Sequence, residues 1–216
     1  PIFHKIITTK LQIETPVTFL NLGGVANVTF INEDKIYSSD IGPGNCLIDK
    51  WIQKKTKKNF DKLGGFARTG KTDKIIYDQA IDQWFYKFKD LTKRNISFDI
   101  NDFDISFVRG LELNDGAATL TEYTSEIIAK YLDSLPSKNI IVCGGGRKNQ
   151  YLIERISNKI SKPLKNIDNF GLDGDYIESK AFAYLAIRSI RGLPISFPTT
   201  TGCNKPSLGG EIKIFK

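Results

Sequence analysis

The sequence predicts one α/β domain over residues 1–216, with a mixed β-sheet flanked by helices. Three observations support this fold class. Strand-like runs follow one another near the amino terminus, amphipathic segments fill the middle, and an apolar run leads directly into Gly144-Gly145-Gly146. Strands joined by short turns indicate antiparallel pairing, whereas a buried strand followed by a glycine loop and a helix is typical of parallel pairing.

The first part of the chain predicts an antiparallel meander. β-branched and aromatic residues are frequent in three runs, which cover residues 17–22, 25–31 and 36–41. Gly23-Gly24 separates the first two runs, and a polar turn at 32–35 separates the last two. The apolar residues after position 45 recur at helical spacing, so a helix should follow the third strand.

Helices and one more strand are expected in the remainder. Thr72 or Asp73 should cap one helix, and Asn114-Asp115 should cap a longer helix that ends before Pro136. Residues 139–143 form the buried strand, and further helices are expected over 152–160 and 175–191. The tail should be a loop with one edge strand.

Composition and charge limit the class of protein. Hydrophobic residues make up 40% and charged residues 25% of the chain, ordinary values for a soluble globular protein. No apolar run has the roughly 18 residues of a membrane helix, and no secretory signal is visible, so we expect a cytoplasmic protein without a membrane partner. The lysines behind the net charge of +7 are spread along the chain, except for a cluster at 54–58 that fits a solvated helix end. We therefore expect no nucleic-acid partner.

The cysteines and the histidine predict no metal ligands. Cys46, Cys143 and Cys203 are too far apart in sequence for a zinc motif, and an odd count is no disulfide framework. His4 has no cysteine or histidine nearby, so we interpret it as structural. The chain contains no methionine and starts at Pro1, so we expect a fragment.

Two glycine-rich turns are candidates for phosphate binding. Gly23-Gly24 lies at the tip of an apolar strand, and Gly144-Gly145-Gly146 lies between a strand and a helix. Glycine lets the backbone approach an oxyanion and present its N–H groups. A plain hairpin turn and a tight strand-to-helix turn remain the alternatives. The dinucleotide fingerprint G-x-G-x-x-G fails, because Asn149 stands at the third glycine position.

A third motif formally matches the Walker A pattern G-x-x-x-x-G-K-[ST], from Gly65 to Thr72. A phosphate-binding P-loop must follow a buried parallel strand. The preceding residues, 57–64, are polar and basic, so the required strand is missing. A P-loop NTPase that would use Lys71 is therefore a weaker alternative.

Two carboxylate positions complete the candidates. Asp40 stands at a strand end before Gly42-Pro43-Gly44-Asn45, where a carboxylate could act as a base or only form a turn. Asp175 and Glu178 have the spacing of a capping box, so helix capping is the simple interpretation of this pair.

Together these motifs resemble the anhydro-N-acetylmuramic acid kinase family of the actin/hexokinase/Hsp70-like superfamily. Five blocks match that family in order, at residues 21–29, 40–45, 115–121, 143–149 and 174–186. The resemblance implies a ribonuclease H-like, actin-like ATPase domain. It also implies an enzyme of cell-wall peptidoglycan recycling and amino sugar metabolism. This kinase would use ATP and Mg²⁺ to phosphorylate 1,6-anhydro-N-acetylmuramic acid and would open its anhydro ring with water.

The resemblance also implies roles for single residues. Gly23 and Gly24 would contact phosphate, and a second group would line the adenosine pocket: Gly144, Gly145, Gly146 and Asn149. Asp40 would be the general base. Gly42, Asn45 and Glu178 would contact the sugar. The stretch from Gly65 to Thr72 would be a coincidental loop.

The chain departs from the family in two respects. The family's first phosphate loop, of the type Gly-Thr-Ser-x-Asp-Gly, is absent from the sequence, and so is most of the facing domain. In the block around Ser97 and Asp99, two basic family positions are occupied by Ile96 and Ile100. We therefore expect a carboxyl-terminal nucleotide-binding half that is inactive alone. It could also be a non-catalytic interaction module, and it could form a homodimer.

Overall fold

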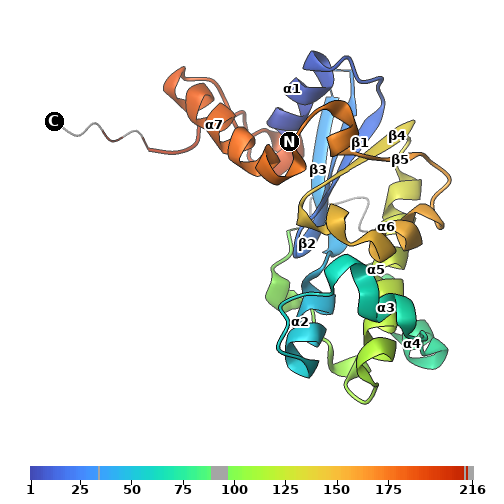
Figure 1. Ribbon diagram of the computed structural model, residues 1–216. Helices are drawn as coiled ribbons and strands as arrows, with labels where there is room; N and C mark the ends of the chain where they lie inside the picture. The colour runs from blue at the N-terminus through green and yellow to red at the C-terminus, as the bar shows by residue number, and fades with distance from the viewer. Residues whose placement is uncertain (34, 89–96, 212, 214–216) are drawn as a thin grey trace.

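The computed structural model describes residues 1–33, 35–88, 97–211 and 213. Its centre is a five-stranded sheet of order β3-β2-β1-β4-β5. The strands are β1 (Val17–Leu22), β2 (Val25–Asn32), β3 (Lys35–Pro43), β4 (Asn139–Cys143) and β5 (Leu164–Asn166). The first three form the expected antiparallel meander, while β4 pairs parallel to β1 and β5 pairs parallel to β4. The predicted fold class, a mixed sheet with flanking helices, is confirmed (Figure 1).

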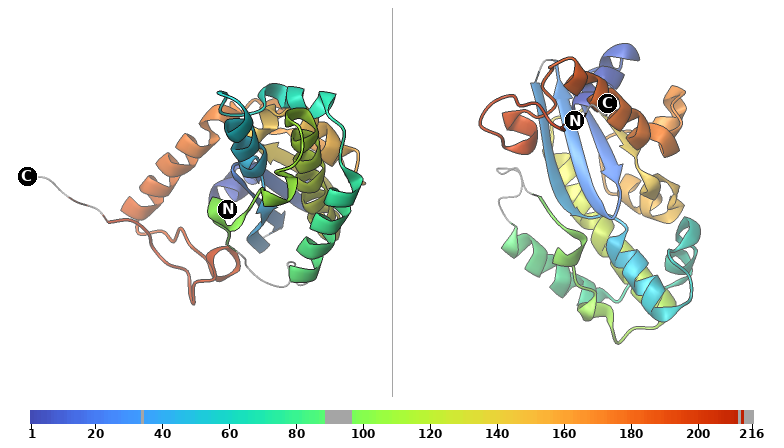
Figure 2. Two further views of the ribbon diagram at one scale, coloured as in Figure 1. Left: turned by 90° about the horizontal axis from the view of Figure 1, so that it is seen from below. Right: turned by 90° about the vertical axis from the view of Figure 1, so that its left-hand side faces the viewer.

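Helices cover both faces of this sheet (Figures 1 and 2). They are α1 (Ile2–Lys10), α2 (Cys46–Lys55), α3 (Gly65–Thr69), α4 (Lys74–Lys87), α5 (Leu113–Ser134), α6 (Gln150–Ser157), α7 (Ile177–Ile190) and α8 (Pro198–Thr201). Short 3₁₀ turns include η1 (Lys62–Gly64), η5 (Gly145–Lys148) and η7 (Gly174–Tyr176). The predicted helices are present, whereas α1, β5 and α8 were not expected.

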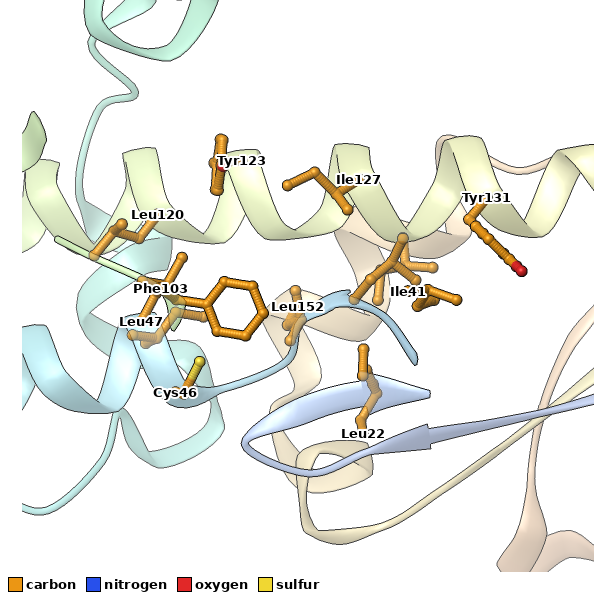
Figure 3. Close-up of a cluster of buried hydrophobic side chains, with 14 of the residues drawn as sticks. Leu22, Ile41, Cys46, Leu47, Phe103, Leu120, Tyr123, Ile127, Tyr131 and Leu152 are labelled. Atoms are coloured by element: carbon orange, nitrogen blue, oxygen red, sulfur yellow. The ribbon is translucent and has the colours of Figure 1, made fainter. Parts of the chain in front are cut away.

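The larger core lies between the sheet and the long helix α5. Side chains alternate along a strand, so every second residue of the meander points to this face. Leu22 and Ile41 face Ile127 and Tyr131 of α5 in Figure 3, and Leu120 continues the row toward α2. This core fixes the end of β1 and β3 at which the glycine turns occur.

The opposite face carries a smaller core under α1 and the start of α7. Val17 and Phe19 of β1 and Ile141 of β4 are buried there, together with Ile7 and Ile177 from the two helices. Since β1 is buried on both faces, it is the central strand of the domain. Beyond its first turn, α7 extends away from the sheet (Figure 1), and Ile177 is its only buried residue in the described part.

One predicted helix cap is correct and another is wrong. Asp73 caps α4, because its Oδ1 accepts a 3.0 Å hydrogen bond from the Ile76 N–H. The long helix α5 instead begins at Leu113, so Asn114 and Asp115 lie inside its first turn. Asp115 Oδ1 accepts a hydrogen bond from the Lys71 N–H at 2.8 Å. A tertiary contact with the segment before α4 therefore replaces the expected cap.

The expected edge strand of the tail is reduced to a single bridge. Ser196 and Ser207 form an isolated antiparallel pair, and α8 lies between them in sequence and contacts β3. In the described part of the chain, no helix is long and apolar enough to cross a bilayer.

Candidate functional site

The two glycine turns lie side by side. β1 and β4 are parallel neighbours in register, with Asn21 opposite Cys143, so both strands end at the same edge of the sheet. The turn after β1 is Gly23-Gly24, and the loop after β4 begins at Gly144. The chain after β3 contacts the first of these turns, because the Asn45 N–H donates to the Gly23 carbonyl at 2.9 Å.

A cavity of about 700 Å³ opens at this junction, and we call it the α2 cavity. One wall consists of Gly23, Gly24, Gly145, Gly146 and Asn149, and the other wall comes from α2 and residues 59–63. Five of the six sequence-predicted cofactor residues therefore line one cavity, and Asn45 lines it as well. The volume is in the range of small-molecule and cofactor sites.

The side chain of Asn45 connects the two loops. Its Nδ2 donates to the Gly23 carbonyl at 3.4 Å, and its Oδ1 accepts from Asn149 Nδ2 at 3.3 Å. Asn149 also caps α6, since its Oδ1 accepts a hydrogen bond from the Leu152 N–H at 3.2 Å. Both asparagines thus hold the shape of the cavity with their side chains.

Three of the loop glycines have no room for a side chain. A Cβ on Gly144, which has a φ of +82°, would lie 2.4 Å from Asn21 Oδ1, and one on Gly146 would lie 2.2 Å from Asn45 Nδ2. Gly44 would meet the Gly23 carbonyl at 2.4 Å. Gly145 differs, because a Cβ there meets no protein atom within 4 Å. The glycine at 145 is therefore not required by its protein neighbours, and it leaves the cavity wall bare.

Asp40 lies at the end of β3, next to a β-bulge. Asn27 pairs with Asp40 whereas Ala26 pairs with Gly42, so one extra residue occupies β3 at this point. Bulges redirect side chains and are frequent beside active sites. Asp40 Oδ2 accepts a 2.8 Å hydrogen bond from the Phe98 N–H. Burial raises the pKa of the half-buried Asp40 carboxyl, and the Phe98 hydrogen bond offsets part of that rise.

Gly42, a predicted sugar contact, has a structural explanation. Its φ is +147°, and a Cβ there would lie 2.8 Å from Ile127 and 3.1 Å from Trp84. The close approach of α4 and α5 therefore accounts for glycine at this position. A role of Gly42 in sugar binding stays a prediction.

A second cavity of about 420 Å³ lies on the other side of the glycine loop. Asn21, Asn27, Gly144 and Gly145 line it together with Glu178, which is exposed in the first turn of α7. Gly145 lines both cavities. Asp40 lines neither cavity. Its partner on the neighbouring strand, Asn27, lines the second one.

The capping-box interpretation of Asp175 and Glu178 is wrong. Helix α7 begins after Tyr176, which makes no side-chain cap. Asp175 instead forms ion pairs with Arg147 at 2.9 Å and with Lys148 at 2.6 Å. These cations hold the Asp175 carboxylate away from the helix end.

Arg147 was missed in the sequence. Its side chain is only 3% exposed. It donates to Asp168 at 3.0 Å, to Asp175 at 2.9 Å and to the Gly144 carbonyl at 3.2 Å. Arg147 therefore ties the glycine loop to the segment that leads into α7 and Glu178. No local pattern identifies these partners, because they follow Arg147 by more than 20 residues.

The Walker-like stretch is not a P-loop. The residues between β3 and Gly65 form helix α2, a loop and η1, so no strand leads directly into the motif. A Cβ on Gly70 would lie 2.0 Å from the Asn114 carbonyl oxygen, so this glycine allows a close contact with α5. The P-loop alternative is therefore excluded.

The structure describes only part of the block around Ser97 and Asp99, in which isoleucine occupies two basic family positions. Asn95 and Ile96 lie outside the described residues. Asp99 Oδ1 accepts from the Asn101 N–H at 2.9 Å, so this aspartate stabilises a local turn. Within the described ranges, no cluster of three or more acidic, histidine or cysteine side chains could hold a metal ion.

A family model described as anhydro-N-acetylmuramic acid kinase matches residues 1–214. A curated relative of that name from Pelagibacter ubique is 46% identical and covers 98% of this chain and 59% of its own length. One from Zymomonas mobilis is 39% identical and covers 98% of this chain and 58% of its own length.

Two solved structures match this chain only distantly. The activator of the 2-hydroxyisocaproyl-CoA dehydratase from Clostridium difficile with bound ADPNP has a TM-score of 0.45 at 11% identity, and covers 80% of this chain and 63% of its own. The ethanolamine utilization protein EutJ from Carboxydothermus hydrogenoformans has a TM-score of 0.40 at 13% identity, and covers 75% and 47%. Both are too remote to support an argument about the site.

The chain spans less than two thirds of the length of these curated relatives. That share does not say which part of the relatives the chain matches, so it does not support the expectation of a carboxyl-terminal half. The match over residues 1–214 and the identities of 39–46% nevertheless show the family. The chain belongs to the anhydro-N-acetylmuramic acid kinase family.

Proposed function

We propose that the α2 cavity binds ATP and that the chain supplies this nucleotide site to a sugar kinase. The kinase would transfer the γ-phosphoryl group to 1,6-anhydro-N-acetylmuramic acid and open the anhydro ring with water, giving N-acetylmuramic acid 6-phosphate. A cytoplasmic location suits such an enzyme, because ATP is its cosubstrate.

One observation carries this proposal. Two glycine turns that are about 120 residues apart in sequence border a single cavity of about 700 Å³, and the bare backbone of Gly145 forms part of its wall. Gly145 and Gly146 open η5, so their N–H groups have no acceptor within that turn. Backbone N–H groups presented by glycine are suited to phosphate oxygens. We therefore place the phosphate end of ATP against Gly145 and Gly146, which the resemblance alone would assign to the adenosine pocket.

Asp40 and Glu178 are the proposed groups on the sugar side. A general base should have a raised pKa and a position near the reacting atoms. Burial raises the pKa of Asp40, which would make it a better proton acceptor for the attacking water. Glu178 faces the second cavity, whose wall includes Gly145, and could orient a sugar hydroxyl there.

Mg²⁺ is expected to enter with the nucleotide. Phosphoryl transfer needs a cation that neutralises the charge developing on the phosphate oxygens. The described residues contain no metal-binding cluster, so the phosphates of ATP would provide most of the ligands of Mg²⁺.

Nucleotide binding by the 216-residue chain tests the proposal. We expect wild-type chain to bind ATP in calorimetric titrations and Gly145→Val to bind at least tenfold more weakly, because the added side chain occupies the cavity. Gly110→Val is the matched control, since a Cβ at Gly110 also meets no atom within 4 Å but lies outside both cavities. Equal binding by all three proteins would contradict the nucleotide site.

Two further expectations concern the chain by itself. We expect negligible kinase activity from the 216 residues alone, because their sequence lacks the family's first phosphate loop. A homodimer also stays a prediction. Exposed apolar side chains on α7, namely Phe182, Ile187 and Ile190, would suit self-association, and light scattering on the purified chain measures it.

A further inference from the structure

Three residues of α2 and its cap form a straight row along the α2 cavity. Asn45, Asp49 and Gln53 are four positions apart and all line the cavity. Residues four apart lie on one face of a helix, and each step advances about 6 Å along its axis. The row therefore runs from the glycine turns, which Asn45 contacts, toward residues 59–63.

Two polar side chains of this wall, Asp61 and Gln53, already have partners. Asp61 accepts from the Phe66 N–H at 2.9 Å and from the Ala67 N–H at 3.0 Å. Gln53 donates from Nε2 to the Asn59 carbonyl at 3.0 Å. The carboxylate of Asp49, by contrast, accepts no hydrogen bond from any residue that the structure describes.

Asp49 is also held in an unfavourable setting for a charge. Its side chain is partly buried in the cavity wall. Burial, and to a smaller extent the negative charge of Asp61, raise the pKa of Asp49 to about 6. A partly desolvated carboxylate without a donor is destabilising until a ligand supplies one.

We propose that Asp49 accepts hydrogen bonds from the ribose hydroxyls of the bound nucleotide, and thereby makes the site prefer ribonucleotides over deoxyribonucleotides. This assignment rests on the proposed nucleotide site. The order along α2 supports it, because ribose lies between phosphate and base just as Asp49 lies between Asn45 and Gln53.

The chemistry of the cavity agrees with this order. A carboxylate repels phosphate, so Asp49 should not lie at the phosphate end. Phe60 and Leu63 are 57% and 47% exposed beyond Gln53, and these apolar surfaces suit a base. A vicinal diol offers the two O–H donors that a carboxylate can accept, in charge-assisted hydrogen bonds.

A purely structural role for Asp49 makes a different prediction. An acidic residue in the first turn of a helix interacts favourably with the helix dipole. If that were its purpose, Asp49→Asn would lower the Tm and leave nucleotide selectivity unchanged. The ribose assignment predicts that Asp49→Asn loses nucleotide selectivity. It also predicts that the Tm of the ligand-free variant rises at pH 7.5, because the uncompensated charge is removed.

The decisive measurement compares ATP with 2′-deoxy-ATP and 3′-deoxy-ATP in titrations of the 216-residue chain at pH 7.5. We expect wild-type chain to bind ATP at least about tenfold more tightly than either analogue, and Asp49→Asn to lose that preference. Asp82→Asn, on the exposed side of α4, is the matched control and should keep it.

The outcomes separate the two proposals. Failure of wild-type chain to bind ATP would contradict the nucleotide site itself. Binding of ATP and both analogues with equal affinity, or a preference that persists in Asp49→Asn, would overturn the role of Asp49 alone. Asp49→Asn could also lose the same amount of affinity for ATP and for both deoxy analogues while its affinity for GTP stays unchanged. That result would overturn the ribose role of Asp49, since Asp49 would then recognise the base.

Discussion

Asn149 donates a hydrogen bond of 3.3 Å from its Nδ2 to Oδ1 of Asn45, although the two residues are 104 positions apart in the sequence. Through this contact the start of α6 is joined to the start of α2, and the cavity is bordered by α2 and by Asn149, the residue that caps α6. This pair of side-chain amides is therefore one of the contacts that hold the two glycine turns together, beside the backbone bond from Asn45 to Gly23 and the pairing of β1 with β4.

Replacing Asn149 should affect both stability and nucleotide binding. Asn149→Ala removes the cap of α6, which should lower the free energy of unfolding by about 1 kcal/mol, and it also removes the contact with Asn45. Asn149→Asp keeps a capping oxygen but no amide donor, so it should recover the stability and not the affinity. Urea unfolding and ATP titration measure the two effects. Wild-type affinity in the alanine variant would show that the Asn45 contact does not shape the site.

Lys71 should be dispensable for nucleotide binding. Its backbone N–H donates to Asp115, and no strand leads directly into the loop that carries it. Lys71→Ala is therefore expected to bind ATP with unchanged affinity, whereas Gly145→Val should not. A loss of ATP binding in Lys71→Ala, with Gly145→Val unaffected, would favour a P-loop after all.

The fold was predictable where local pattern and tertiary structure agree. The three strands of the meander and β4 combine β-forming residues with glycine turns, and the long helices have a regular apolar stripe. The three residues of β5 are too few to show a period. Helix α1 is held by contacts that no local pattern contains, such as the stacking of the His4 and Phe19 rings at 4.6 Å.

Of the candidate site, the sequence predicted mainly the glycine turns. The turns at Gly23-Gly24 and at Gly144 were candidates because glycine lets the backbone approach an oxyanion, although tight turns alone would also explain glycine there. The part played by Asp115 and Arg147 was missed, because each bonds to residues more than 20 positions away. Asp49 could have been found from its spacing of four to Asn45 and Gln53, once α2 was known to line a cavity.

Arg147 should contribute more to stability than any exposed ion pair. Its guanidinium is buried and binds two carboxylates that are themselves 43% and 49% exposed. Arg147→Met should lower the free energy of unfolding by about 2 kcal/mol, less than for a fully buried pair because Asp168 and Asp175 regain water. Arg68→Ala is the control, since its pair with Glu154 is half-exposed and should contribute less than about 1 kcal/mol. If urea unfolding showed that Arg147→Met and Arg68→Ala lose the same free energy of unfolding, Arg147 would contribute no more than an exposed ion pair.

His4 should make the chain sensitive to acid. Its Nδ1 is 2.9 Å from Thr29 Oγ1, and burial, helped by the positive amino terminus, lowers the pKa of His4 to about 3. The unfolded chain binds a proton at this residue below about pH 6.5, whereas the folded chain does not. The contribution of His4 to stability is therefore complete above pH 6.5 and is lost as the pH falls toward 3, by up to about 1.4 kcal/mol per pH unit.

The difference between wild-type chain and His4→Phe isolates this effect. Asp49 acts in the opposite direction, because its raised pKa favours the folded state as the pH falls from about 6 to 4, and both proteins contain it. Phenylalanine keeps a ring that can stack on Phe19, but it cannot take up a proton. Urea unfolding between pH 7 and pH 4.5 should show the wild-type chain losing stability relative to His4→Phe. Parallel curves would mean that His4 is protonated equally in both states, and thus that its ring is open to water.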